Sequence, residues 1–317
     1  MKKLMLLIST LVVILALSAC NSGNRNEGNV VYTTVYPVQY LVEQLAGDTV
    51  RVERVPGSLA HSTSYSWSAR ELVEMVNADL LFHIAGGVDN YIPNNEAAFS
   101  DGGVELVDIS QHVEYNMICL SHDHEDSEDS SDDICDENSL TPDPHFWLDP
   151  VKMLQAAQFI KDKLIATYPE NEKIINNNYL VLSKLLDTLD RDYQRMGLEA
   201  TKPIITTVML FTYWHERYEL EILPLTKSIH TSDQDPSDII DIIVEATERN
   251  IHYILFERNA NSPSGEQVLL ELRDVFNDAE QLYLHGLGNL TSEEFENGSN
   301  YITIMYENLD ILKLATK

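Results

Sequence analysis

A long segment without Gly or Pro divides this chain into two halves that carry the same kind of pattern. Residues 170–196 have apolar side chains at helical spacing and lack both helix-breaking residues, which predicts one stiff helix. On each side of it, short apolar runs alternate with amphipathic helical patterns, as in parallel sheets covered by helices. We therefore predict an α/β fold of two similar lobes, each with a parallel-type sheet flanked by helices, joined by one long rigid helix.

The strand candidates indicate where a ligand would bind. Before the long helix they are residues 30–35, 50–55, 80–84 and 104–107, and after it residues 203–207, 222–225, 252–256 and 281–284. A capping box at Ser68–Glu71 opens one helix, and Asp149-Pro150 opens another that runs to about Tyr168. In open parallel sheets, ligands bind at the carboxyl ends of the strands, so we predict a site in the cleft between the lobes.

The first 20 residues have the pattern of an export signal. Lys2-Lys3 precede an apolar stretch, residues 4–17, that is too short to span a bilayer, and small residues lead to Cys20. This resembles a bacterial lipoprotein signal, cleaved before Cys20, whose thiol then carries lipid; an ordinary secretory signal is the alternative. We expect an extracytoplasmic protein anchored to the cell membrane, with a signal peptide (1–19), a tether (20–29), an N-terminal lobe (30–168), an interlobe helix (169–196) and a C-terminal lobe (197–317).

The chain is strongly acidic, with a net charge of −30. Loss of residues 1–19 would remove Lys2 and Lys3 and no acid, which gives −32. Such a charge repels nucleic acid and attracts cations. Nine of the fifteen residues from Asp123 to Glu137 are acids, in a loop (121–138) that also carries His122 and His124. We predict that this loop is a secondary, metal-collecting segment.

Two cysteines bracket the acidic loop. If Cys20 carries lipid, then Cys119 and Cys135 remain as a pair in an oxidising compartment. A disulfide between them would close the loop at its base. Zinc binding by the two thiolates is the alternative, but the surrounding negative charge disfavours thiolate formation. We therefore predict the disulfide.

Four histidines stand where predicted loops and strand ends should face the cleft. One of them lies in an unusual run, Asp143-Pro144-His145-Phe146-Trp147-Leu148-Asp149-Pro150, directly after the acidic loop. Imidazole is a good zinc ligand, although any single histidine of this kind could be an ordinary turn residue. The predicted metal ligands are His61, His145, His230 and His285.

Enzyme signatures are absent from the sequence. His215-Glu216-Arg217-Tyr218-Glu219 resembles a zinc-protease helix, but the second histidine of that motif is replaced by Glu219. Neither a Gly-x-Ser-x-Gly run nor a Gly-rich phosphate loop occurs. We predict that the protein is not an enzyme.

Several motifs resemble those of one family, the metal-binding lipoproteins of bacterial zinc and manganese ABC importers (the ZnuA/AdcA/TroA type). The resemblance implies a rigid two-lobed protein around one divalent metal, without a catalytic step, acting as a monomer with an ABC-importer permease as partner. It implies that His61 and His145 are ligands. The matching segments are Val31–Pro37, Ala60–Tyr65, Asn77–Phe82, Asp143–Pro150, Tyr168–Asn171, Phe211–Leu220 and Gly298–Leu309.

The resemblance fails at the ligands expected from the C-terminal lobe. The family's third ligand, three positions before the Phe-x-Tyr motif, is replaced by Val208. The fourth falls on His285 or Gly288. His61, His145 and His285 with water, or with His230, still make an imidazole-rich site, which favours Zn²⁺ over Mn²⁺. A manganese-binding homologue, or a degenerate adhesin-like lipoprotein without a tight transport site, are the alternatives.

Overall fold

The computed structural model describes residues 29–57, 66–119, 140–226 and 236–317. Within these ranges, no helix is both long enough and apolar enough to cross a bilayer. Several predicted features lie outside the described residues: the signal peptide and tether, Cys20, His61, His122, His124, Cys135 and His230. The side chain of Cys119 also lies outside them, so the predicted disulfide stays a prediction.

The N-terminal lobe is built on a four-stranded parallel sheet with the order β2-β1-β3-β4. Every residue of β1 and β3 is buried, because helices cover the central strands on both faces. The strands are β1 (Val30–Thr33), β2 (Arg51–Arg54), β3 (Leu80–His83) and β4 (Glu105–Asp108), and the helices are α2 (Tyr36–Ala46), α3 (Ala69–Met75) and α4 (Glu96–Gly102). The capping box predicted for α3 is present at Ser68 and Glu71.

The C-terminal lobe repeats this topology. Its parallel sheet has the order β10-β9-β7-β8, so in both lobes the first strand along the chain lies between the second and the third. The predicted fold class, two similar lobes with parallel sheets, is therefore confirmed. The strands are β7 (Ile204–Thr206), β8 (Ile222–Pro224), β9 (Tyr253–Glu257) and β10 (Glu280–Leu284), and the helices are α7 (Thr212–Tyr218), α8 (Pro236–Glu248), α9 (Pro263–Val275), α10 (Ser292–Glu296) and α11 (Tyr301–Ala315).

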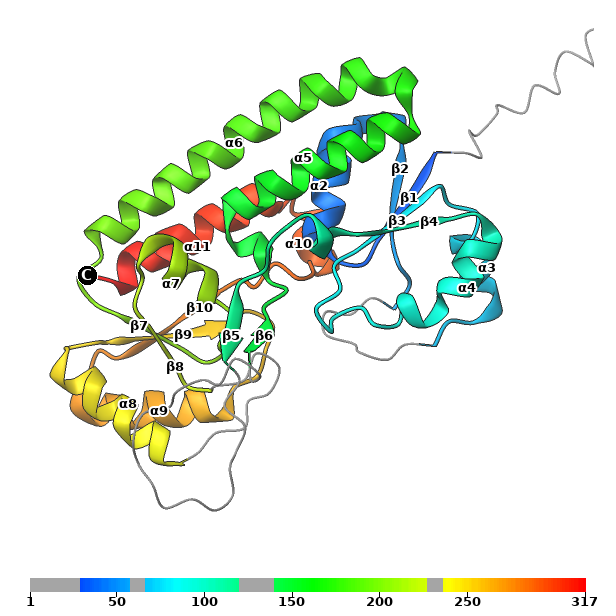
Figure 1. Cartoon of the computed structure of the whole chain (residues 1–317). Coiled ribbons are helices and arrows are strands. Elements are labelled where there is room, and N and C mark those ends of the chain that lie inside the picture. The colour runs from blue at the N-terminus through cyan, green and yellow to red at the C-terminus, as the bar shows by residue number, and fades with distance from the viewer. Residues whose placement is uncertain (1–28, 58–65, 120–139, 227–235) are drawn as a thin grey trace, which may run out of the picture.

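Two long helices, α5 (Pro150–Thr167) and α6 (Glu172–Glu199), connect the lobes (Figure 1). Helix α5 begins as predicted, with the Asp149 side chain accepting a hydrogen bond from the Val151 N–H at 2.7 Å. Helix α6 begins three residues later than predicted, because Pro169–Asn171 form a separate 3₁₀ turn. Its inner face buries Leu182, Leu186, Leu189 and Tyr193, and it packs on α2, α5 and α11, so it contacts both lobes.

A short antiparallel hairpin leads to the histidine motif. It pairs β5 (Met117–Cys119) with β6 (Leu140–Pro142) and was not predicted. Each strand has only three residues, too few for a period-two pattern to be recognised in the sequence. The hairpin pairs residues 117–119 with residues 140–142 and leads the chain directly to Asp143.

Candidate metal centre

His145 is held in one ring orientation by a buried carboxylate. The ring is almost fully buried, and its Nδ1 lies 2.6 Å from Asp143 Oδ1. Because a carboxylate only accepts hydrogen bonds, Nδ1 is the donor in this contact. A carboxylate behind one imidazole nitrogen is the usual support for a histidine that binds a metal through the other.

Asp143 is in turn held by the C-terminal lobe. It is fully buried, and its Oδ1 also accepts the backbone N–H of His145 at 3.0 Å. At the start of α7, the Thr212 hydroxyl donates to Asp143 Oδ2, and the Tyr213 hydroxyl donates to the Asp143 carbonyl at 2.6 Å. Thr212 and Tyr213 of α7 thus both bond to the residue that orients His145, so the two lobes share one hydrogen-bonded network.

The aromatic residue two positions after His145 ties the motif to the loop after β10. The Trp147 indole N–H donates to the Gly286 carbonyl at 2.8 Å, and the Tyr301 hydroxyl donates to the Trp147 carbonyl at 2.7 Å. The His145 and Trp147 rings meet edge to face, with centroids 5.1 Å apart. These contacts fix the distance between His145 and the C-terminal sheet.

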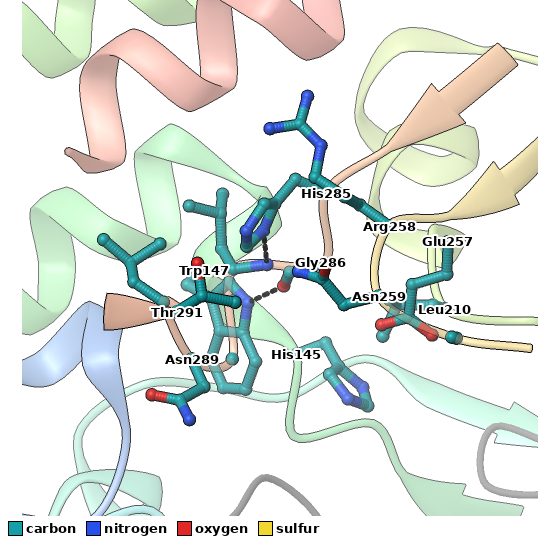
Figure 2. A pocket seen from close by; sticks show the side chains of 14 residues that line it. His145, Trp147, Leu210, Glu257, Arg258, Asn259, His285, Gly286, Asn289 and Thr291 are labelled. Carbon is teal, nitrogen blue, oxygen red and sulfur yellow. Dashed lines mark hydrogen bonds between the residues drawn. The ribbon is translucent and has the colours of Figure 1, made fainter. Parts of the chain in front are cut away.

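A cavity of about 440 Å³ lies between His145 and the C-terminal sheet (Figure 2). One wall of the cavity, the C-terminal wall, belongs to the C-terminal lobe. It is formed at the carboxyl ends of three parallel strands, where ligands of open α/β sheets bind. Leu210 follows β7, the segment Glu257–Ala260 follows β9, and the segment His285–Thr291 follows β10. The cavity has the position that the sequence predicted for the site.

His285 lines this cavity, but both of its ring nitrogens have partners within the C-terminal lobe. Nδ1 accepts a hydrogen bond from the Leu287 N–H at 2.8 Å, and Nε2 lies 3.2 Å from Glu294 Oε1. Burial lowers the pKa of the His285 imidazole, which favours the neutral ring with its proton on Nε2. In Figure 2 the ring is directed away from His145. His285 would have to release one partner before it could bind a metal.

Glu257, which the sequence analysis missed, presents a carboxylate to the same cavity as His145. Burial raises the pKa of this carboxyl, and the nearby His145 acts in the opposite direction. The neighbouring Arg258 is occupied elsewhere, 3.0 Å from Glu307 Oε2 and 3.7 Å from Glu294 Oε1. The position was detectable in principle, since Glu257 directly follows the strand candidate 252–256.

Val208, at the position of the family's third ligand, is half-buried and packs against the main hydrophobic core. In the part of the chain that the structure describes, no group of three His, Cys, Asp or Glu side chains is arranged to hold a metal ion. The predicted ligands His61 and His230 lie outside that part. The full ligand set therefore stays a prediction, with His145 as its described member from the N-terminal lobe.

Comparison with known proteins identifies the family. The family model described as the zinc-uptake complex component A, periplasmic (ZnuA), matches residues 31–315. The chain belongs to the ZnuA family. This agrees with the resemblance seen in the sequence.

Two curated relatives of this ZnuA-family chain carry zinc in their names. It is 27% identical to the zinc-binding lipoprotein AdcA of Streptococcus pneumoniae over 322 residues, which cover 100% of this chain and 61% of AdcA. The chain thus spans about three fifths of that relative's length. It is 26% identical to the high-affinity zinc uptake system protein ZnuA of Bacillus subtilis over 286 residues, which cover 89% of this chain and 86% of that protein.

A solved structure shows the same fold. The Zn(II)-bound ZnuA-like domain of S. pneumoniae AdcA superimposes with a TM-score of 0.68 at 25% identity, covering 91% of this chain and 99% of that domain. Both the two-lobed architecture and Zn²⁺ as the metal of such proteins are therefore supported by relatives.

Proposed function

We propose that this protein is an extracytoplasmic lipoprotein that binds Zn²⁺ in the cleft between its lobes and delivers it to an ABC permease for import. The observation that carries the proposal is His145, which lines the cavity and has its Nδ1 2.6 Å from a carboxylate oxygen of the buried Asp143. A carboxylate behind one ring nitrogen is the usual support for a histidine that binds a metal through the other nitrogen.

The proposed ligands from the sequence are His145 and His61, with His285 or His230 from the C-terminal lobe. Imidazole donors favour zinc over manganese, which prefers oxygen. Manganese remains the alternative cargo. An adhesin-like lipoprotein without a tight site is a second alternative, which Val208 at a ligand position of the family favours.

Three accessory features belong to the same proposal. Cys20 carries the lipid that anchors a monomeric protein to the cell membrane. A disulfide between Cys119 and Cys135 closes the acidic loop, within which His122 and His124 help to collect zinc. The β5–β6 hairpin supports this picture, because it pairs the strands that precede and follow that part of the chain.

Zinc titration of the mature protein, from Cys20 onward, tests the proposal. Competition with a chelator should reveal one tight zinc per chain, weaker manganese binding, and loss of tight binding in a His61→Ala, His145→Ala double variant. Uptake of ⁶⁵Zn by cells that lack the chain should recover with the parent and not with the double variant. Stoichiometric zinc binding that survives both substitutions would place the site elsewhere.

A further inference from the structure

We propose that Glu257 is the ligand that the C-terminal lobe supplies to the cleft metal, in place of the donors absent at Val208 and Gly288. The inference rests on the proposed function and names a residue of the same site. It follows from what surrounds the Glu257 carboxylate, and from which other groups of the C-terminal wall already have partners.

The position of Glu257 suits a ligand. It is the last residue of β9, at the carboxyl end of a central strand of the C-terminal sheet. Its side chain and that of His145 line the same cavity, and His145 acts on its ionisation, so the two groups are close enough to interact. A cation in this cavity would lie within reach of the His145 ring and of a Glu257 carboxylate oxygen.

The absence of a side chain at residue 286 makes room for this carboxylate. A Cβ built on Gly286 would come within 2.8 Å of Glu257 Oε1 and 2.6 Å of Leu210 Cδ2. The Gly286 carbonyl is meanwhile fixed by the Trp147 indole, so this backbone cannot easily withdraw. The Glu257 carboxylate therefore lies against a rigid stretch of backbone, and only glycine fits there without displacing it.

No described residue neutralises Glu257. Among residues 29–57, 66–119, 140–226 and 236–317, no side chain forms a hydrogen bond or an ion pair with the Glu257 carboxylate. Arg258, the nearest cation in the sequence, is directed to Glu307 and Glu294. A half-buried carboxylate without a protein partner can accept a cation, which would offset the loss of part of its hydration.

The competing donor, His285, is less suited to the role. Its Nδ1 accepts the Leu287 N–H, and its Nε2 faces Glu294. Metal binding through Nδ1 would leave the buried Leu287 N–H without its acceptor, and binding through Nε2 would compete with the 3.2 Å contact to Glu294, whereas binding through Glu257 breaks no described contact. An imidazole and a carboxylate are both ordinary zinc ligands, so His145 and Glu257 can belong to one zinc site.

The substitution Glu257→Gln tests the inference, because it removes the charge and keeps the shape. We expect zinc affinity, measured by chelator competition, to fall by at least the roughly 10- to 100-fold that loss of a supporting partner of a metal ligand costs. Manganese affinity should fall further, since that ion depends more on oxygen donors. The matched control is Glu307→Gln, which removes a carboxylate that pairs with Arg258 outside the cavity lining; it should bind zinc like the parent.

A second variant tests the geometry without removing a ligand. Gly286→Ala should push the Glu257 carboxylate aside, lower zinc affinity, and change the zinc-edge X-ray absorption spectrum of the loaded protein. Parent-like zinc affinity in Glu257→Gln, with an unchanged absorption spectrum, would overturn the inference while leaving zinc transport intact. If the parent itself binds no zinc, it is the proposed function that fails, so the two failures are distinguishable.

Discussion

The two walls of the cleft contain similar residues that are used in different ways. On the N-terminal wall, His145 has Nδ1 bonded to a buried carboxylate that accepts hydrogen bonds from three donors, one of which is His145 Nδ1. His145 supplies its ring and backbone N–H groups, and Thr212 supplies its hydroxyl. The Tyr213 hydroxyl donates to the backbone carbonyl of Asp143. On the C-terminal wall, His285 has both nitrogens engaged, and Glu257 lacks a described partner. The residue type alone therefore does not identify a ligand; what lies behind each side chain does.

This contrast also separates fixed from adaptable parts of the site. The Asp143–His145 pair is fully buried and cannot move without breaking contacts to α7. Glu257 has no such support and can adjust to the ion that enters. A preorganised donor on one wall and an adjustable donor on the other would let the site adapt to the ion without moving the lobes.

The largest effect should come from removing the fixed donor. His145→Ala should reduce zinc affinity by more than the roughly 100-fold upper range for losing a supporting partner, because it deletes the ligand itself. Chelator competition measures the loss. His112→Ala is the matched control. His112 is an exposed histidine of the same lobe, and its ring stacks on Phe159 with the two ring centroids 3.6 Å apart. Equal zinc affinity in the two variants would show that the N-terminal wall does not bind the metal.

A smaller loss is expected when the support behind His145 is weakened. Asp143→Asn keeps the size of the side chain but removes its charge, so zinc affinity should fall about 10- to 100-fold while the ligand remains. Asp89→Asn provides the control, because Asp89 is an equally buried carboxylate that accepts bonds from the Thr34 hydroxyl and the Ile84 N–H, both at 2.7 Å. If both variants lose stability but only Asp143→Asn loses zinc, the support is specific; a shared loss of zinc would mean a general structural effect.

A gain of affinity is expected from Val208→His, which restores nitrogen at the position of the family's third ligand. Zinc should bind more tightly, because a protein donor replaces water in the coordination sphere. Without metal, the variant should lose about 1–3 kcal/mol of unfolding free energy, the cost of an unsatisfied buried polar group. Urea unfolding without zinc measures the loss of unfolding free energy, and unfolding with zinc measures the stabilisation that the bound metal provides. Lower stability in both states with unchanged zinc affinity would mean that Val208 packs away from the cleft.

The smallest change in affinity is expected from His285→Ala. Zinc affinity should stay within about threefold of the parent, or roughly 0.7 kcal/mol, because both ring nitrogens already serve the C-terminal lobe. Unfolding free energy should nevertheless drop by about 1–3 kcal/mol, since the Leu287 N–H loses its acceptor. A loss of zinc affinity as large as that of His145→Ala would restore His285 to the ligand set and remove the asymmetry between the walls.

The sequence predicted the fold more completely than the site. All eight strands of the two sheets and the capped start of α5 were predicted within about two residues, because hydrophobic runs and capping residues act locally. The β5–β6 hairpin was missed, since two three-residue strands on either side of an acidic loop leave no periodic signal.

The site could be predicted only as far as residue type and strand ends allow. His145 was found from its motif, and the structure shows the carboxylate behind it. The engagement of both His285 nitrogens depends on Leu287 and Glu294, which meet that ring only after the loop following β10 has folded. Glu257 was missed because an acid at a strand end is common, and its lack of a partner is a property of the folded cavity.

The most direct test of the central claim is a crystal structure of the zinc-loaded protein, with anomalous differences recorded on both sides of the zinc absorption edge. The account predicts a single strong peak in the cavity, at about 2.0–2.2 Å from His145 Nε2 and from one Glu257 oxygen, with His285 still bonded to the Leu287 N–H. A peak bound by His285 with Glu257 turned away, or a zinc site without His145, would contradict it.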